Sequence, residues 1–123
     1  MERMMTDDEL QKLWNTYQGA WADIPAQERE QRLRATLSPD IAFTNPDADE
    51  QGIERMIASV NEFQQRYAGC YFRTTLLRRQ HGQLIAIWTM FDCNDAPLVN
   101  GQSYARFDVQ PRRFTQLAGF WKL

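Results

Sequence analysis

The sequence predicts a single α+β domain in which helices come first and a curved antiparallel sheet follows. Apolar residues recur at helical spacing in the first half of the chain, whereas from Cys70 onward they recur with a period of two. Short turn-rich segments separate the later strands, which is typical of an antiparallel meander. The 123 residues have room for one hydrophobic core, so we expect residues 1–123 to form one domain.

The first helix is predicted from a capping box and an apolar stripe. The Thr6 hydroxyl can accept the Glu9 amide, while the Glu9 side chain can reach back to Thr6. We expect the helix to extend to about Ala22, before Pro25. Its stripe carries three large rings and consists of Leu10, Leu13, Trp14, Tyr17 and Trp21.

Two further helices and a short strand follow. Residues 26–37 form a polar helix in this interpretation, with Glu and Arg at i,i+4 spacing, and Ser38-Pro39-Asp40 ends it. Residues 41–45 form a strand that Pro46 closes. The third helix ends at Gly69, and its apolar positions are Ile53, Met56, Ile57, Val60, Phe63 and Tyr67.

The sheet is predicted to contain strands near 71–79, 84–92, 98–109 and 113–121. In the second of these, both alternating faces are largely apolar. An antiparallel strand with one wet face would alternate apolar with polar residues. We therefore expect the helices to cover one face and another surface to cover the other.

Charge and composition exclude several classes of function. The net charge is −2 with no basic run beyond arginine pairs, so we expect no nucleic-acid binding. No apolar run is long enough to cross a membrane, and the first residues lack a secretory signal, which predicts a cytoplasmic protein with reduced Cys70 and Cys93.

Several short motifs, in their order and spacing, carry a resemblance to a known fold family. They are Ile41-Ala42-Phe43-Thr44-Asn45-Pro46, Gly52-Ile53-Glu54 with Phe63, Ile87-Trp88, Gly101 to Phe107, and Leu117 to Phe120. From about Leu10 to Phe120 the chain resembles the nuclear transport factor two-like superfamily, a cystatin-like α+β cone, and within it the SnoaL-like polyketide cyclase branch. The resemblance implies three N-terminal helices packed on a curved antiparallel sheet around an apolar pocket.

The resemblance does not carry over an intact catalytic set. Steroid-isomerase-like members place a base aspartate where this chain has Asn45, and a neutral acid where it has Ser103. An amide has no titratable oxygen, so Asn45 can orient a substrate but cannot take its proton. Epoxide-hydrolase members need an Arg-x-Asp and a second aspartate, where this chain has Trp88-Thr89-Met90 and Gly119.

Asp92 is the candidate acid or base, with two interpretations open. Period two places it on the inner face with Trp88 and Met90, where desolvation would raise the pKa of its carboxyl group. Alternatively, Asp92 opens the turn that follows the strand and is solvated. Asn45 is either a pocket hydrogen-bonder or the extended residue before a proline, and Tyr17 is either an oxyanion donor or a core ring.

The predicted function is a small-molecule pocket for a largely apolar ligand. If catalytic, it would run a cofactor-independent isomerisation, cyclisation or dehydration; the alternative is a non-catalytic binding or dimerisation module. One histidine and scattered acids predict no metal, and we expect no cofactor. The ligand-binding residues expected are Trp14, Trp21, Phe43, Phe63, Phe72, Trp88, Ser103, Phe107, Gln116 and Phe120.

An outer sheet face rich in apolar side chains also predicts a homodimer through that face. The side chains expected there come from strand 84–92, Tyr71, Tyr104 and Trp121. Monomers seldom expose more than a few hundred Å² of contiguous apolar surface.

Overall fold

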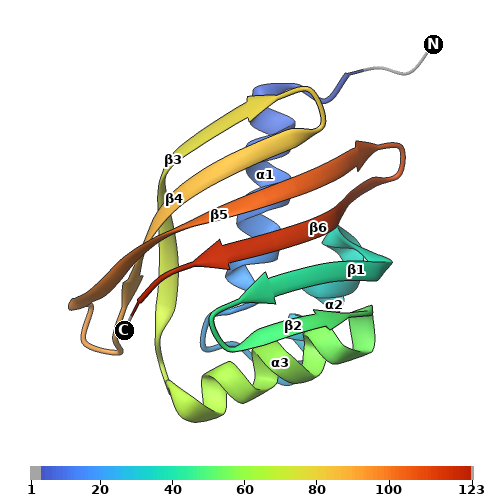
Figure 1. Cartoon of the computed structure of the whole chain (residues 1–123). Coiled ribbons are helices and arrows are strands. Elements are labelled where there is room, and N and C mark those ends of the chain that lie inside the picture. The colour runs from blue at the N-terminus through green and yellow to red at the C-terminus, as the bar shows by residue number, and fades with distance from the viewer. Residues whose placement is uncertain (1–3, 123) are drawn as a thin grey trace.

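A computed structural model describes residues 4–122 as three helices packed against one face of a six-stranded mixed sheet (Figure 1). The helices are α1 (Asp7–Gly19), α2 (Ala26–Thr36) and α3 (Ile53–Arg66). The strands are β1 (Leu37–Asn45), β2 (Ala48–Gln51), β3 (Tyr71–Gln80), β4 (Gln83–Phe91), β5 (Pro97–Val109) and β6 (Arg112–Phe120). None of the described helices has the length and apolar character needed to cross a membrane.

The sheet has the order β2-β1-β6-β5-β4-β3. Strands β3 to β6 form the predicted antiparallel meander. The prediction of an all-antiparallel sheet is wrong at one place, because β1 pairs with β6 in parallel. A parallel pair has no connecting hairpin to mark it, and here α3 and the meander lie between the two strands in the chain.

Helix α1 begins as predicted but ends earlier. The Thr6 hydroxyl accepts the Glu9 amide at 3.1 Å, and the reciprocal bond of the capping box is present. The helix stops at Gly19 instead of Ala22, because the amides of Ala20, Trp21 and Ala22 bond to carbonyls three residues back instead of four. Arg29 donates to the carbonyls of Ala20, Ala22 and Ile24 at 2.8–3.1 Å.

The first strand is longer than predicted, and a second strand was missed. Strand β1 begins at Leu37, and its register with β6 shifts between Leu37 and Ala42, so the proline of Ser38-Pro39-Asp40 lies at an irregularity where no ladder donor is needed. Strand β2 contains Ala, Asp, Glu and Gln, which have low strand propensity, and its antiparallel pairing with β1 holds it.

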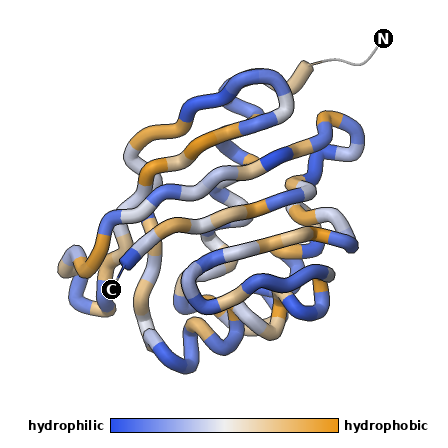
Figure 2. The backbone as a smooth tube through the Cα atoms, viewed as in Figure 1, coloured by the Kyte–Doolittle hydropathy of each residue, from blue (hydrophilic) through white to orange (hydrophobic). Residues whose placement is uncertain are grey.

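Strand β4 confirms the expected two-faced pattern (orange along β4 in Figure 2). Leu84, Ala86, Trp88 and Met90 point towards the helices and are buried. On the opposite face Ile85 and Ile87 remain 49% and 39% exposed. The helices therefore cover one face only.

The α1–α2 connection depends on a buried arginine, which yields a stability prediction. Arg29 is 5% exposed and also donates to Asn61 Oδ1 at 2.9 Å, so it joins α2, α3 and the segment after α1. Arg29→Met should lower the free energy of unfolding by about 2–4 kcal/mol, because it leaves carbonyls without a donor. Urea denaturation measures the loss.

Arg34→Met is the matched control, because it makes the same chemical change in α2. Arg34 pairs with Glu30 and Glu54 at the surface, where ion pairs contribute little. Equal urea midpoints for the two variants would show that the Arg29 contacts do not hold this connection.

Candidate functional site

A cavity lies between α1 and the concave face of the sheet, on the side that the helices cover. Its apolar walls come from both helices and strands. They include six aromatic side chains, which are Trp14, Trp21, Phe43, Phe72, Trp88 and Trp121. Its remaining apolar lining is Met56, Leu117, Ala118 and Gly119. Its polar side chains are Tyr17, Gln18, Thr44, Asn45 and Ser103.

The enclosed part of the cavity is narrow. Positions open to the centre of a water molecule total about 40 Å³, which is enough for a few waters. Together with the mouth that opens to solvent, the empty space is about 500 Å³. A bicyclic ligand would therefore lie partly in the mouth unless the surrounding rings move.

Trp88 forms the centre of the aromatic wall. Its side chain is 3% exposed, and its ring meets Phe72 edge-to-face at 4.9 Å and Trp121 at 5.7 Å between centroids. Phe72 in turn meets Trp21 at 5.9 Å. Edge-to-face contacts of this kind stabilise beyond the area that they bury, so these four rings form one rigid wall.

Two glycines make room for this wall. A Cβ atom at Gly101 would lie 2.4 Å from Trp88 Cη2 and 2.8 Å from the carbonyl oxygen of Phe120. At Gly119 it would lie 2.7 Å from Cζ3 of Trp121. Glycine at these two positions therefore leaves the space that the two indole rings occupy against β5 and β6.

Three tryptophans donate their ring N–H to a hydroxyl group at the cavity. Trp88 Nε1 donates to Ser103 Oγ at 3.0 Å, and Trp21 Nε1 donates to Tyr17 Oη at 3.0 Å. Trp14 Nε1 donates to Thr74 Oγ1 at 2.8 Å, and the Thr74 hydroxyl donates to Gln18 Oε1 at 2.7 Å. Since an indole N–H can only donate, it fixes each hydroxyl oxygen as an acceptor of that bond.

Tyr17 is held as a neutral phenol. Burial raises its pKa well above the usual range, and the bond from Trp21 offsets this only in part. The hydroxyl therefore keeps its proton at any physiological pH. This removes Tyr17 as a general base but leaves it as a hydrogen-bond donor.

Asn45 lies at the end of β1 beside the β6 floor, with its Cβ 3.7 Å from the position that a Cβ at Gly119 would take. Its Oδ1 atom accepts the backbone N–H of Asp47 at 2.8 Å. Both interpretations of Asn45 thus have support, because the side chain closes the turn at Pro46 and also lines the cavity.

The structure brings most of the predicted site residues together. Tyr17 and Asn45 line the cavity, and so do six of the predicted ligand-binding residues: Trp14, Trp21, Phe43, Phe72, Trp88 and Ser103. Phe63 and Phe107 do not. Phe63 packs behind the wall, against Trp21 at 5.2 Å, and Phe107 is buried in the main core against Phe114.

Asp92 lies in the turn and does not line the cavity. Strand β4 ends at Phe91, so the alternation that would carry Asp92 inward stops one residue before it. Its Oδ1 atom accepts the backbone N–H groups of Asn94 and Ala96 at 2.8 and 3.0 Å. The geometry is that of the turn-opening aspartate, the second of the two interpretations.

At the end of β6, the side chains of two neighbouring residues lie on the opposite faces from those predicted. Phe120 was expected in the pocket but pairs with Gln102 on the outer face and is 58% exposed. Trp121 was expected on the outer face but folds back over Gly119 to line the cavity. Gln116 lies on the same outer side as Phe120 and is exposed.

Several lining residues were missed by the sequence reasoning. Gln18 follows Trp14 by one helical turn, so helical spacing gives a signal that could have found it. Thr44 and Ala118 are neighbours across the β1–β6 pair, which no local pattern reveals. The Trp121 fold-back depends on Gly119 in three dimensions and has no sequence signal of its own.

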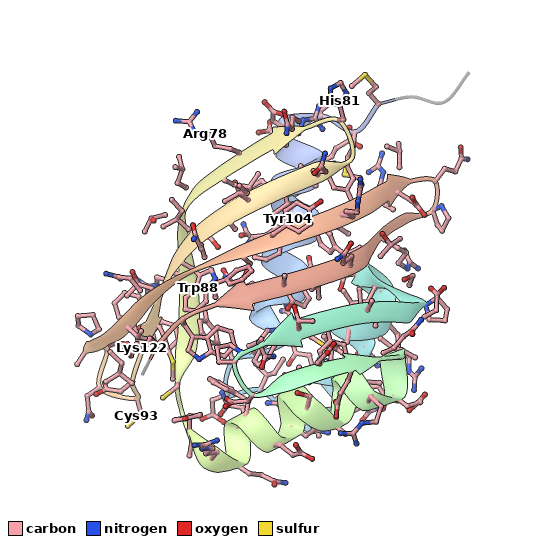
Figure 3. All side chains as sticks on the ribbon, in the orientation of Figure 1. Arg78, His81, Trp88, Cys93, Tyr104 and Lys122 are labelled. Atoms are coloured by element: carbon pink, nitrogen blue, oxygen red, sulfur yellow. The ribbon has the colours of Figure 1, made fainter. Side chains whose placement is uncertain are left out.

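The cavity lining contains no carboxylate, imidazole, amine or guanidinium among the residues that the structure describes. Within residues 4–122 there is also no group of three His, Cys, Asp or Glu side chains placed to hold a metal ion. His81, the one histidine of the chain, lies exposed at the tip of the β3–β4 hairpin (Figure 3). What the arrangement offers a ligand is aromatic surface and neutral hydrogen-bonding groups.

The fit between Gly101 and Trp88 can be tested by adding one methyl group. Gly101→Ala should destabilise the protein by about 1–3 kcal/mol, because ring and backbone must shift, and it should change tryptophan emission. Thermal unfolding and fluorescence measure both. Gly19→Ala is the control, since its Cβ meets only the Arg32 side chain; equal effects would contradict the proposed fit.

The sequence matches no protein-family model and no curated protein. Solved structures match it at low identity. A candidate isomerase of the SnoaL-like family from Agrobacterium tumefaciens superimposes with a TM-score of 0.84 at 14% identity, covering 92% of this chain and 97% of that chain. A protein of unknown function with a cystatin-like fold from Methylobium petroleophilum gives 0.77 at 16% identity, covering 98% and 80%.

A candidate SnoaL-like polyketide cyclase from Shewanella putrefaciens gives a TM-score of 0.70 at 14% identity, covering 90% of this chain and 78% of that chain. At such identities the likeness concerns the fold. The fold implied by the sequence motifs is confirmed: this chain has the cystatin-like α+β fold that SnoaL-like and nuclear transport factor two-like proteins share.

Proposed function

We propose that this protein binds a small, largely apolar molecule in the cavity between α1 and the sheet. The observation that carries the proposal is the aromatic wall of Trp21, Phe72, Trp88 and Trp121, with Trp14 and neutral polar groups lining the same space. Small-molecule sites typically combine apolar and aromatic walls with a small number of placed polar groups.

Binding without side-chain acid–base chemistry fits the geometry better than catalysis. A general base must lie within hydrogen-bond reach of the proton that it takes and must titrate near the working pH. Tyr17 stays protonated, Asn45 and Gln18 do not titrate, and Asp92 is engaged in its turn. The ligand would thus be held and oriented rather than deprotonated by the cavity lining.

A cofactor-independent isomerase, cyclase or dehydratase is the second candidate. It is favoured by the names of structural neighbours, which include a candidate isomerase and candidate polyketide cyclases. In this chain such a reaction would depend on stabilising a developing negative charge with the neutral donors Tyr17 and Ser103, since no lining carboxylate is available among the described residues.

A dimer through the open face of the sheet is the second part of the proposal. Across the strands, Leu76 lies opposite Ile87, and Ile85 opposite Tyr104. Tyr104 lies on the face of the sheet away from α1 (Figure 3). Leu76, Ile85, Ile87 and Phe120 are 39–58% exposed there. Arg78, on the edge strand β3, lies opposite Ile85 on the same face. A contiguous apolar patch on an open sheet face suits a second copy of the chain.

Ligand binding can be tested on Trp88. The wild type should bind a neutral, apolar fluorescent probe such as 6-propionyl-2-(dimethylamino)naphthalene with a change in tryptophan emission, and Trp88→Phe should fold with modest loss. Trp88→Ala leaves a cavity and removes the Ser103 contact, so the free energy of unfolding should fall by about 3–5 kcal/mol.

The two hypotheses differ in the wild-type result. Saturable binding by the wild type that Trp88→Phe weakens indicates an open pocket. A wild type that binds no probe, with Trp88→Ala unfolded, would show that its own side chains fill the cone and that the module interpretation is right.

The dimer can be tested by charging the open face. At micromolar concentration the wild type should sediment at about twice the 14.5 kDa chain mass, and the double variant Ile85→Lys/Ile87→Lys should sediment as a folded monomer. Gln116→Lys, on the same face but outside the patch, is the control and should remain dimeric. A wild-type particle of 14.5 kDa would rule the dimer out.

A further inference from the structure

The direction of the hydrogen bonds at the cavity determines which ligand atoms it can satisfy. Each indole N–H donates its one hydrogen to a hydroxyl oxygen, so the hydrogen of that hydroxyl must point in another direction. For Ser103 and Tyr17, no residue of the described chain accepts that proton. Both hydroxyls line the cavity, and both are therefore free to donate into it.

A relay of two hydrogen bonds, from Trp14 through Thr74, orients the Gln18 amide. Trp14 Nε1 can only donate, so Thr74 Oγ1 accepts from it, and the Thr74 hydroxyl donates to Gln18 Oε1 at 2.7 Å. The end of the amide that faces Thr74 is therefore the carbonyl oxygen. The amino group Nε2 is left at the other end, and within residues 4–122 it donates to no protein acceptor.

Asn45 repeats the pattern from the opposite side of the cavity. Its Oδ1 atom accepts the Asp47 backbone N–H at 2.8 Å, which again fixes the amide and leaves Nδ2 free of protein acceptors in the described chain. Four lining residues thus each accept one hydrogen bond from the protein, while within the described chain their donor hydrogens are unused. No lining carboxylate or imidazole of the described residues offsets them.

We infer that the cavity selects apolar ligands that carry acceptor oxygens of the ketone class, over ligands of the same size that carry hydrogen-bond donors. This inference rests on the proposed binding function and adds the ligand class to it. Ketone oxygen supplies two lone pairs and no proton, which matches a lining that can give two or more hydrogen bonds. A ligand N–H would meet oxygens that already accept one hydrogen bond each from the protein, and it would leave the unused donors of the lining unpaired, which is costly in a desolvated site.

The lining favours a neutral ketone over an anionic acceptor. None of the lining residues in the described chain carries a positive charge, so a buried carboxylate would lose its hydration without a counter-charge. The raised pKa of Tyr17 keeps its donor proton in place across the physiological range.

The test compares three bicyclic probes of similar size by isothermal titration calorimetry on the full chain: indan-1-one, indane and indole. Indan-1-one offers an acceptor only, indane neither, and indole a donor only. We expect indan-1-one to bind at least tenfold more tightly than indane or indole, since a site built to hydrogen-bond a group rejects analogues without it.

Two variants probe the donors directly. Ser103→Ala should weaken indan-1-one about five- to tenfold while leaving indane within about twofold. Gln18→Glu keeps an oxygen towards Thr74 and replaces the free amino group by an oxygen, so at pH 8 it should reduce or reverse the preference for indan-1-one over indole. Thr89→Val removes a hydroxyl that bonds Asn100 outside the cavity lining and should change neither.

The outcomes separate the two levels of the proposal. If indole binds as tightly as indan-1-one, or all three bind equally, the ligand class is wrong while the binding function stands. If no probe binds, the binding function itself is wrong and the ligand class with it. The ranking in the wild type decides the matter even if a variant fails to fold.

Discussion

The position of the Trp88 ring is the constraint on which the rest of the site depends. The ring is buried on the inner face of β4, where it needs both space and an acceptor for its one N–H. Gly101 on the neighbouring strand supplies the space, and Ser103, two residues further on the same face of β5, supplies the acceptor at 3.0 Å. Because Gly101 and Ser103 are two residues apart on one strand, both the space and the acceptor lie on the face that Trp88 occupies.

The opposite wall depends on interactions that hold an irregular segment in place. Trp21 follows the end of α1, and its own carbonyl oxygen accepts from Gln64 Nε2 at 2.7 Å. Arg29 binds the carbonyls of Ala20 and Ala22 on either side of it. A buried guanidinium satisfied by carbonyls replaces the helical bonds that the segment lacks, so the loop can present a large ring to the cavity without being mobile.

The fold follows from the sequence wherever the signal is local. The capping box at Thr6, the stripe around Trp14 and the alternation in β4 each report their own element, and the structure has those elements. What the sequence does not show are relations between distant segments: the parallel pairing of β1 with β6, and the strand β2 that depends on β1 for its existence. The cavity was predictable as a cluster of rings for the same reason, because rings at helical or strand spacing share a face.

The errors at Asp92 and Trp121 have one physical cause, which is that alternation is informative only inside a strand. Asp92 is one residue past the end of β4, and Trp121 is one residue past the end of β6. Beyond those ends the backbone turns, so an odd or even position in the chain no longer tells which face of the sheet a side chain lies on. Phe120 shows the opposite failure, because a large apolar residue was assigned inward by type although its pairing with Gln102 places it outward.

Hydrogen-bond direction carries more functional information here than residue type. The polar residues of the cavity (Tyr17, Gln18, Asn45 and Ser103) could each serve as donor or acceptor if taken from a sequence alone. The protein reduces this ambiguity because each of their oxygens accepts a hydrogen bond, from an indole N–H (Tyr17 and Ser103), a backbone N–H (Asn45) or the Thr74 hydroxyl (Gln18). Three tryptophans therefore act twice, as apolar wall and as the groups that polarise the lining. Replacing any one of them by phenylalanine would preserve much of the wall but release the oxygen behind it, so the chemical preference of the cavity can change without a change in its shape.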